Sequence, residues 1–95
     1  MIFAELQYEQ PYADAHFSLV ALLGQHFQNL ESGLQGDSWI WILDKGLKVS
    51  VDTFTSMHHQ VKASQPSWLL DQVLAILANQ YKLRMADPPA PEGYE

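Results

Sequence analysis

The sequence predicts an α+β domain in which one antiparallel sheet carries two helices on one face. Several short segments alternate apolar and polar residues with the period of a strand, and two longer segments repeat apolar residues with the period of a helix. The predicted strands in the middle of the chain follow one another with no helix between them. Such an arrangement favours an antiparallel sheet whose helices pack on one face.

The first part of the chain predicts a strand and then a helix. Residues 2–8 alternate, with Ile2, Ala4, Leu6 and Tyr8 on one side. Pro11 suits the start of a helix, and residues 12–28 carry an apolar stripe at helical spacing. That stripe consists of His16, Val20, Leu23 and Phe27, widened by Phe17 and Ala21.

The middle of the chain predicts four strands. Residues 30–37 contain two glycines and indicate a short, twisted or bulged strand. Residues 38–43 and 47–54 are rich in β-branched and aromatic side chains and flank a short polar break. Residues 57–63 alternate and complete the predicted sheet.

The last part of the chain predicts a second helix and a tail. Residues 66–83 carry a wide apolar stripe, with Pro66 in the first turn and Ser64 or Ser67 available as a cap. Residues 86–95 contain three prolines and little that could be buried, so they are predicted to be a disordered, acidic tail. The domain is therefore expected to span residues 1–85.

The resulting order is β-α-β-β-β-β-α. This order is similar to that of helix-grip and TBP-like folds, and the resemblance concerns topology only. A fold of this kind does not determine a function, because unrelated functions share the same folds.

The residues between the two central strands decide which face Trp39 and Trp41 occupy. A two-residue turn at Lys45 and Gly46 would place both tryptophans outside, but its first position prefers Asn, Asp or Gly. A three-residue loop that includes Asp44 fits a type I turn closed by a left-handed glycine. It also makes every cross-strand pair on the tryptophan face apolar, so the sequence favours the three-residue loop.

With this register, the tryptophans face the helices and the residues between them face outward. Ile40, Ile42 and Phe54 then form an apolar group on the outer sheet face. Cover by neighbouring side chains is one interpretation of this group. A surface for a protein partner or for self-association is the other.

The charge and composition exclude several classes of function. The formal net charge is −6, and the five Lys and Arg residues form no cluster, which argues against binding to nucleic acid or to an anionic membrane. There is no cysteine, and no apolar run has the length of a membrane span. The N-terminal residues do not resemble a signal peptide, so a soluble, cytoplasmic protein is expected.

Two functional hypotheses remain, and the first is favoured. It is a small non-catalytic interaction module of the regulator, immunity or adaptor type, with a protein partner or a second copy on the outer sheet face. A second copy could instead pair along an edge strand, and the acidic surface could engage a basic partner. The alternative is a small-ligand binder or enzyme with a pocket between sheet and helices, lined by Trp39, Trp41, Phe27 and His59. No cofactor or metal is expected, since an inward His16 or His59 fits a hydrogen-bonded core histidine better than a ligand.

Overall fold

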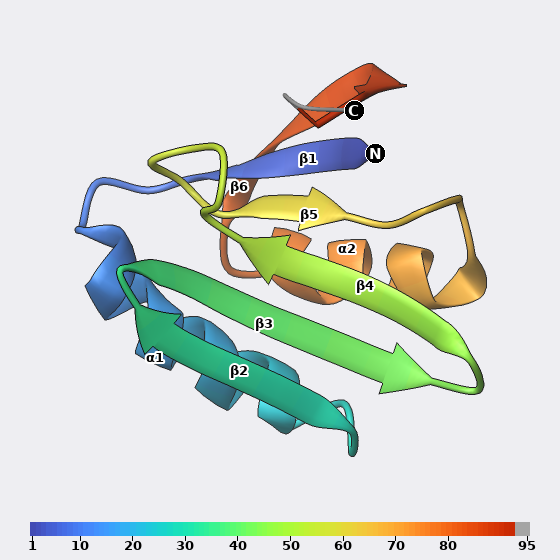
Figure 1. Cartoon of the computed structure of the whole chain (residues 1–95), viewed down its shortest axis with the longest axis horizontal. Helices are drawn as coiled ribbons and strands as arrows, with labels where there is room; N and C mark the ends of the chain where they lie inside the picture. The colour runs from blue at the N-terminus through green and yellow to red at the C-terminus, as the bar shows by residue number, and fades with distance from the viewer. Residues whose placement is uncertain (93–95) are drawn as a thin grey trace.

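The computed structural model describes residues 1–92 and has the predicted α+β architecture. A six-stranded antiparallel sheet lies in the order β2-β3-β4-β5-β1-β6, and both helices lie behind it in Figure 1. The elements are β1 (Ile2–Gln7), α1 (Tyr12–Gly24), β2 (Leu30–Gln35), β3 (Asp37–Asp44), β4 (Leu47–Asp52), β5 (Gln60–Lys62), α2 (Trp68–Ala78) and β6 (Lys82–Ala90). Helix α1 packs against β2 and β3, and α2 packs against β4 and β6.

The hydrophobic core fills the space between the sheet and the helices. Helix α2 buries most of its predicted stripe, but α1 buries a face that is rotated from the predicted one. Phe17 and Ala21, which were predicted to widen the stripe of α1, are exposed, and the buried residues of this helix are Ala15, His16, Leu19, Leu22 and Leu23. Fully buried members of the core are Leu6, Leu19, Leu23, Ile40, Ile42, Val49, Val51, Val61, Leu69, Val73 and Leu77.

Both helices are shorter than predicted. Helix α1 ends at Gly24, whereas the sequence pattern predicted an end near residue 28. Helix α2 begins after the predicted cap Ser67, whose hydroxyl oxygen accepts from the backbone N–H of Leu70 over 3.1 Å. It ends at Ala78 because the residues from Lys82 onward alternate and join the sheet.

Strand β6 was not predicted, and it corrects the predicted tail. Residues 86–90 were expected to be disordered, but they form the second half of β6, which pairs antiparallel with β1. Pairing satisfies the backbone groups on the side of β1 that β5 leaves open, and Pro88 and Pro89 are tolerated because β6 is an edge strand. The rest of the predicted tail reaches residues 93–95, which lie outside the described residues.

The predicted hairpin register is wrong. Asp44 pairs with Leu47, so the turn has two residues, Lys45 and Gly46, with φ angles of 49° and 81°. Positive φ at both positions is the type I′ geometry, which matches the twist of the strands. A left-handed lysine costs about 1–2 kcal/mol. Val49 and Val51 would lie on the helix side in either register, so the two registers differ in burying Ile40 and Ile42 or the two larger indoles there. The observed register also places Ser38 on the helix side, where its hydroxyl contacts His16 and His59.

This register reverses the predicted faces of β3. Ile40 and Ile42 are fully buried under the helices, so they do not form the outer apolar group that the sequence predicted. Trp39 and Trp41 lie opposite Asp52 and Ser50 on the outer face and are partly exposed. A shift of one residue is enough to exchange the faces, because side chains alternate along a strand.

Candidate functional site

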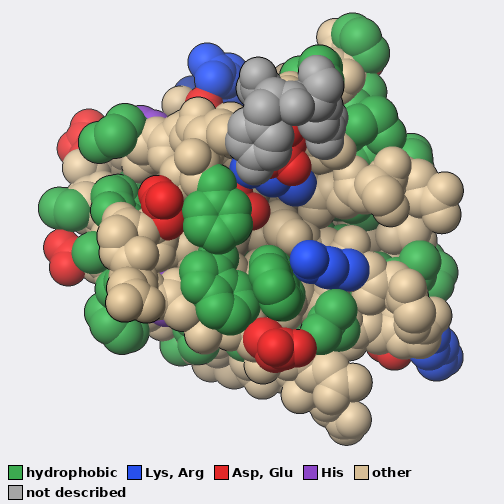
Figure 2. Space-filling view, in the orientation of Figure 1, with side chains coloured by type: hydrophobic (Ala, Val, Ile, Leu, Met, Phe, Trp, Pro, Cys, Tyr) green, Lys and Arg blue, Asp and Glu red, His purple; other side chains and the backbone are tan. Residues whose placement is uncertain are grey.

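The outer face of the sheet carries an aromatic patch formed by Trp39, Trp41 and Phe54. The two indole rings lie 4.7 Å apart between centroids, tilted by 46°, and the Phe54 side chain is 46% exposed. Figure 2 looks onto this face and shows hydrophobic side chains gathered at its centre, with charged side chains around them. Large apolar groups that neighbour one another on an open sheet face are less common than scattered ones.

Gly33 on β2 positions the first indole of the patch. Gly33 pairs with Trp39 across the strands, and a Cβ atom added to Gly33 would lie 2.4 Å from Trp39 Nε1. The indole therefore lies flat over the glycine, in space that any larger residue would fill. Its N–H group has no hydrogen-bond partner among residues 1–92.

Lys48 on β4 holds the second indole. Its ammonium nitrogen lies 3.8 Å from the ring centroid of Trp41, which is cation–π geometry. The Lys48 side chain is exposed, and the described residues give it no ion-pair partner. The patch thus has a cation at its border that remains available to an anionic group.

A buried ion pair lies next to the patch. Lys62 Nζ contacts Asp52 Oδ1 at 2.7 Å and Glu92 Oε2 at 2.9 Å, and it lies 5.9 Å from the centre of the Phe54 ring. Burial opposes the charge on Lys62, but the hydrogen bonds to Asp52 and Glu92 outweigh burial and raise its pKa. Lys62 is therefore a charged, fixed part of the face.

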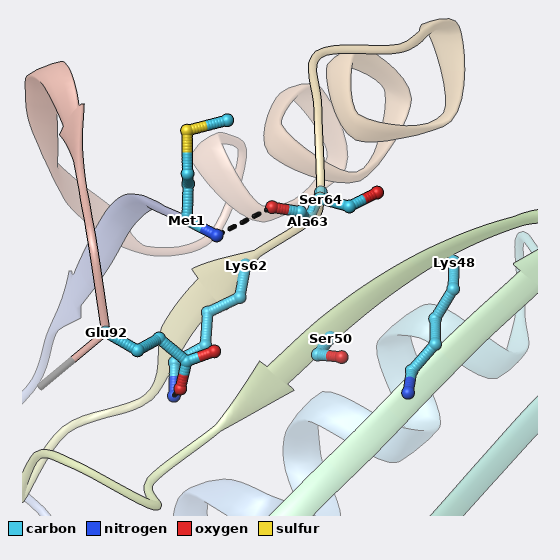
Figure 3. Close-up of a pocket in the computed structure, with 7 residues that line it drawn as sticks. All are labelled: Met1, Lys48, Ser50, Lys62, Ala63, Ser64 and Glu92. Carbon is cyan, nitrogen blue, oxygen red and sulfur yellow. Dashed lines mark hydrogen bonds and ion pairs between the residues drawn. The ribbon is translucent and has the colours of Figure 1, made fainter. Parts of the chain in front are cut away.

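A hollow of about 270 Å³ opens beside Lys48 and Lys62. Figure 3 shows Ser50 between the two lysines, Glu92 against Lys62, and the Met1 ammonium group donating to the carbonyl oxygen of Ala63 over 2.8 Å. The lining residues are Met1, Lys48, Ser50, Lys62, Ala63, Ser64 and Glu92. The lining combines the ammonium groups of Lys48 and Lys62 and two serine hydroxyls with the carboxylate of Glu92, which already contacts Lys62. Lys48 is therefore the group of this lining that best suits a small anion such as a carboxylate.

The residues predicted for an internal pocket do not come together. Trp39 and Trp41 face outward, whereas His59 is fully buried on the helix side. Phe27 is partly buried after the end of α1, where it lines a separate hollow with His26 and Asp44. Of the residues predicted for the outer face, Phe54 is exposed there and Ile40 and Ile42 are not.

A series of side-chain hydrogen bonds crosses the interior from α1 to Tyr8, the residue that follows β1. Ser38 Oγ lies 2.6 Å from His16 Nδ1 and 2.7 Å from His59 Nε2. His59 Nδ1 in turn lies 2.7 Å from the hydroxyl oxygen of Tyr8, which also accepts from the backbone N–H of His59. Four side chains, from the residue after β1, from α1, from β3 and from the segment before β5, are joined in this way.

Two directions of donation satisfy these contacts, and in both the phenol oxygen of Tyr8 accepts the His59 backbone N–H. In one direction, Tyr8 O–H donates to His59 Nδ1, His59 Nε2–H donates to Ser38, and the Ser38 hydroxyl donates to His16 Nδ1. In the other direction, the donor and acceptor of each of these three bonds are exchanged. Both imidazoles are neutral in either arrangement.

Burial favours the same neutral state. It lowers the pKa of His59 to about 4, with smaller contributions from the nearby His16 and His58, and it lowers the pKa of His16. Ser38 has no exposed surface, so its hydroxyl cannot meet a substrate. This series of hydrogen bonds therefore links the elements around the core.

Sequence reasoning missed several residues that define the outer face and the buried series of hydrogen bonds. Ser38 and Tyr8 carried no signal, because their partners are distant in sequence. Gly33 was read only as a sign of a bulge. Lys48 could have been placed beside Trp41 if the two-residue turn had been chosen, since the register follows from the turn.

No group of three or more potential metal-ligating side chains occurs among residues 1–92. Over the same residues, neither helix has the length and apolar character needed to cross a membrane. Comparison with protein-family models, with curated proteins and with solved structures found no match.

Proposed function

We propose that this protein is a non-catalytic interaction module that binds a protein partner through the outer face of its sheet. The observation that carries the proposal is the aromatic patch, where Trp39 and Trp41 lie side by side on the face of the sheet opposite α1 and α2. Tryptophan is enriched among the residues that dominate binding energy at protein interfaces. Its exposure on a sheet face leaves apolar area in water that a partner would bury.

The polar surroundings of the patch suggest the chemistry of the partner. Lys48 offers its ammonium group to an anion at the border of the patch, while the Lys62 charge is already balanced by Asp52 and Glu92. The partner segment that fits best presents apolar side chains to the indoles and a carboxylate to Lys48. Recognition of this type requires no catalytic group.

Site-specific photo-crosslinking tests this proposal. In one variant of the full chain, an amino acid that carries a photoreactive benzophenone replaces Phe54. In the matched control variant, the same amino acid replaces Phe17, which is 67% exposed on α1. The expected result is a discrete crosslinked partner from the Phe54 position that the Phe17 position does not capture. Mass spectrometry then identifies the partner and the crosslinked segment.

The affinity of the identified partner decides the assignment. Trp41→Ser should weaken binding at least about tenfold, which corresponds to about 1.4 kcal/mol. Phe17→Ser, which removes an exposed aromatic ring from the helix layer, should leave the affinity unchanged. Equal affinities of Trp41→Ser and the unmodified chain, with both proteins folded by circular dichroism, would rule out the outer face as the binding surface.

Lys48 is tested by the same titration. Lys48→Met keeps most of the aliphatic stem on Trp41 and removes the charge, so it should weaken binding and reduce its dependence on salt. Lys45→Met removes an exposed lysine from the β3–β4 turn and serves as the control. If the affinity of Lys48→Met depends on salt as strongly as that of the unmodified chain, the proposed contact between Lys48 and a carboxylate of the partner is contradicted.

A further inference from the structure

The sheet has two edges, and they differ in how they are protected. Strand β6 ends one edge and contains Pro88 and Pro89, which cannot donate to another strand. Strand β2 ends the other edge and has six residues, Leu30–Gln35, without a proline. In Figure 1 no described segment lies alongside the edge of β2 that is opposite β3. Natural sheets rarely leave such an edge unprotected unless it is used.

The hydrogen-bond pattern shows which groups of β2 point to this edge. Leu43 N–H donates to the carbonyl oxygen of Asn29 over 3.0 Å, so the odd-numbered residues of β2 bond to β3. Thr53 N–H donates to the carbonyl oxygen of Ser38 over 3.0 Å, so the even-numbered residues of β3 bond to β4. The odd-numbered residues of β3 are then the ones that bond to β2, which is consistent with the Asn29–Leu43 bond. The N–H and C=O groups of Leu30, Ser32 and Leu34 therefore point away from the sheet.

We propose that two copies of this chain pair through β2, antiparallel and about a two-fold axis at Ser32, to form one continuous sheet. An antiparallel ladder joins the outward-pointing residues of one strand to those of the other. Only a pairing centred on Ser32 uses all three positions of both strands, with Leu30 opposite the second copy's Leu34. An isologous contact of this kind closes after two copies.

The side chains on both faces are complementary in this register. On the helix side, Leu34, which is 36% exposed, gains the second copy's Leu30 as a neighbour. On the outer face, Glu31 lies opposite the second copy's Gly33, so the two glutamates do not face each other directly. The indole N–H of Trp39, which lies over Gly33 without a hydrogen-bond partner in residues 1–92, then meets a carboxylate. This complementarity favours a second copy over an unrelated strand.

The pairing does not depend on the proposed function of the outer face, and its test is separate. Sedimentation equilibrium of the full chain, over roughly 1 μM to 1 mM, covers the range of weak to moderate affinities. The expected mass at the upper end is twice the 10.8 kDa of one chain. Ser32→Pro removes the central N–H group that points to the free edge, and it leaves every hydrogen bond between β2 and β3 in place. This variant should therefore remain at the mass of one chain. The control Ser32→Val keeps the N–H and should reach the doubled mass.

Amide hydrogen exchange of the unmodified chain provides a second test that needs no variant. Leu30, Ser32 and Leu34 should be protected only at high concentration, whereas Glu31 and Gly33 should be protected throughout because they bond to β3. A chain that stays monomeric near the upper concentration overturns the proposal. So does a folded Ser32→Pro variant that reaches the doubled mass, or exchange at the three even positions that is independent of concentration.

Discussion

At the scale of single residues, the hydroxyl of Ser38 joins two neutral histidines inside the domain. The sequence predicted that His16 and His59 are hydrogen-bonded core residues, and each is buried and hydrogen-bonded in the structure. It did not predict that their shared partner is a serine side chain, because Ser38 is 22 residues from His16 and 21 from His59. Local patterns carry no information about such contacts.

The neutral histidines make the fold sensitive to acid. The pKa of His59 is lowered from 6.5 to about 4 in the folded chain, so the unfolded chain binds this proton first as the pH falls. The contribution of His59 to the free energy of unfolding is fully present above about pH 6.5. It decreases as the pH falls toward 4, by roughly 3 kcal/mol for a pKa shift of this size. His16 changes stability in the same direction. Urea midpoints measured at several pH values and constant ionic strength check this expectation.

Two histidine variants separate this effect from general acid denaturation. His59→Gln should be less stable at neutral pH but should lose much of the slope between about pH 6.5 and 4, because the buried titrating group is gone. His26→Gln replaces an exposed histidine after α1 and should keep the slope of the unmodified chain. Equal slopes in all three proteins would show that His59 does not cause the sensitivity.

At the scale of elements, the sequence predicted the order of strands and helices through α2 and missed two features, the register of the β3–β4 hairpin and strand β6. Turn preference favoured a three-residue loop because lysine is a poor residue for positive φ, but the observed register buries Ile40 and Ile42 and joins Ser38 to His16 and His59. Strand β6 was missed because prolines indicated a tail, whereas the open side of β1 offers a partner. Both errors arise where a local preference competes with a contact that is distant in sequence.

The turn itself yields a stability prediction. Lys45→Asn should raise the free energy of unfolding by roughly 0.5–1 kcal/mol, because asparagine adopts the left-handed conformation at lower cost. Lys45→Ala keeps a Cβ atom at the strained position and should give no such gain. Chemical denaturation of the three proteins measures the differences. A loss of stability in Lys45→Asn would contradict the two-residue turn.

At the scale of the whole molecule, the sheet has one face covered by helices and one open face that bears the aromatic patch. The fold class followed from periodicity, but the identity of the outward residues did not, because a shift of one residue exchanges both faces of β3. The proposed partner surface therefore rests on Trp39 and Trp41 rather than on the isoleucines between them. Pairing through β2 would place two such patches on one continuous sheet.

Hydroxyl-radical footprinting of the free chain and of its complex with the crosslinked partner tests this account most directly. Trp39 and Trp41 should react readily in the free chain, because both lie on the open face, and should be protected in the complex. Phe17 should react equally in both states. Tryptophans that are already protected in the free chain, or that react equally with and without the partner, would contradict the account.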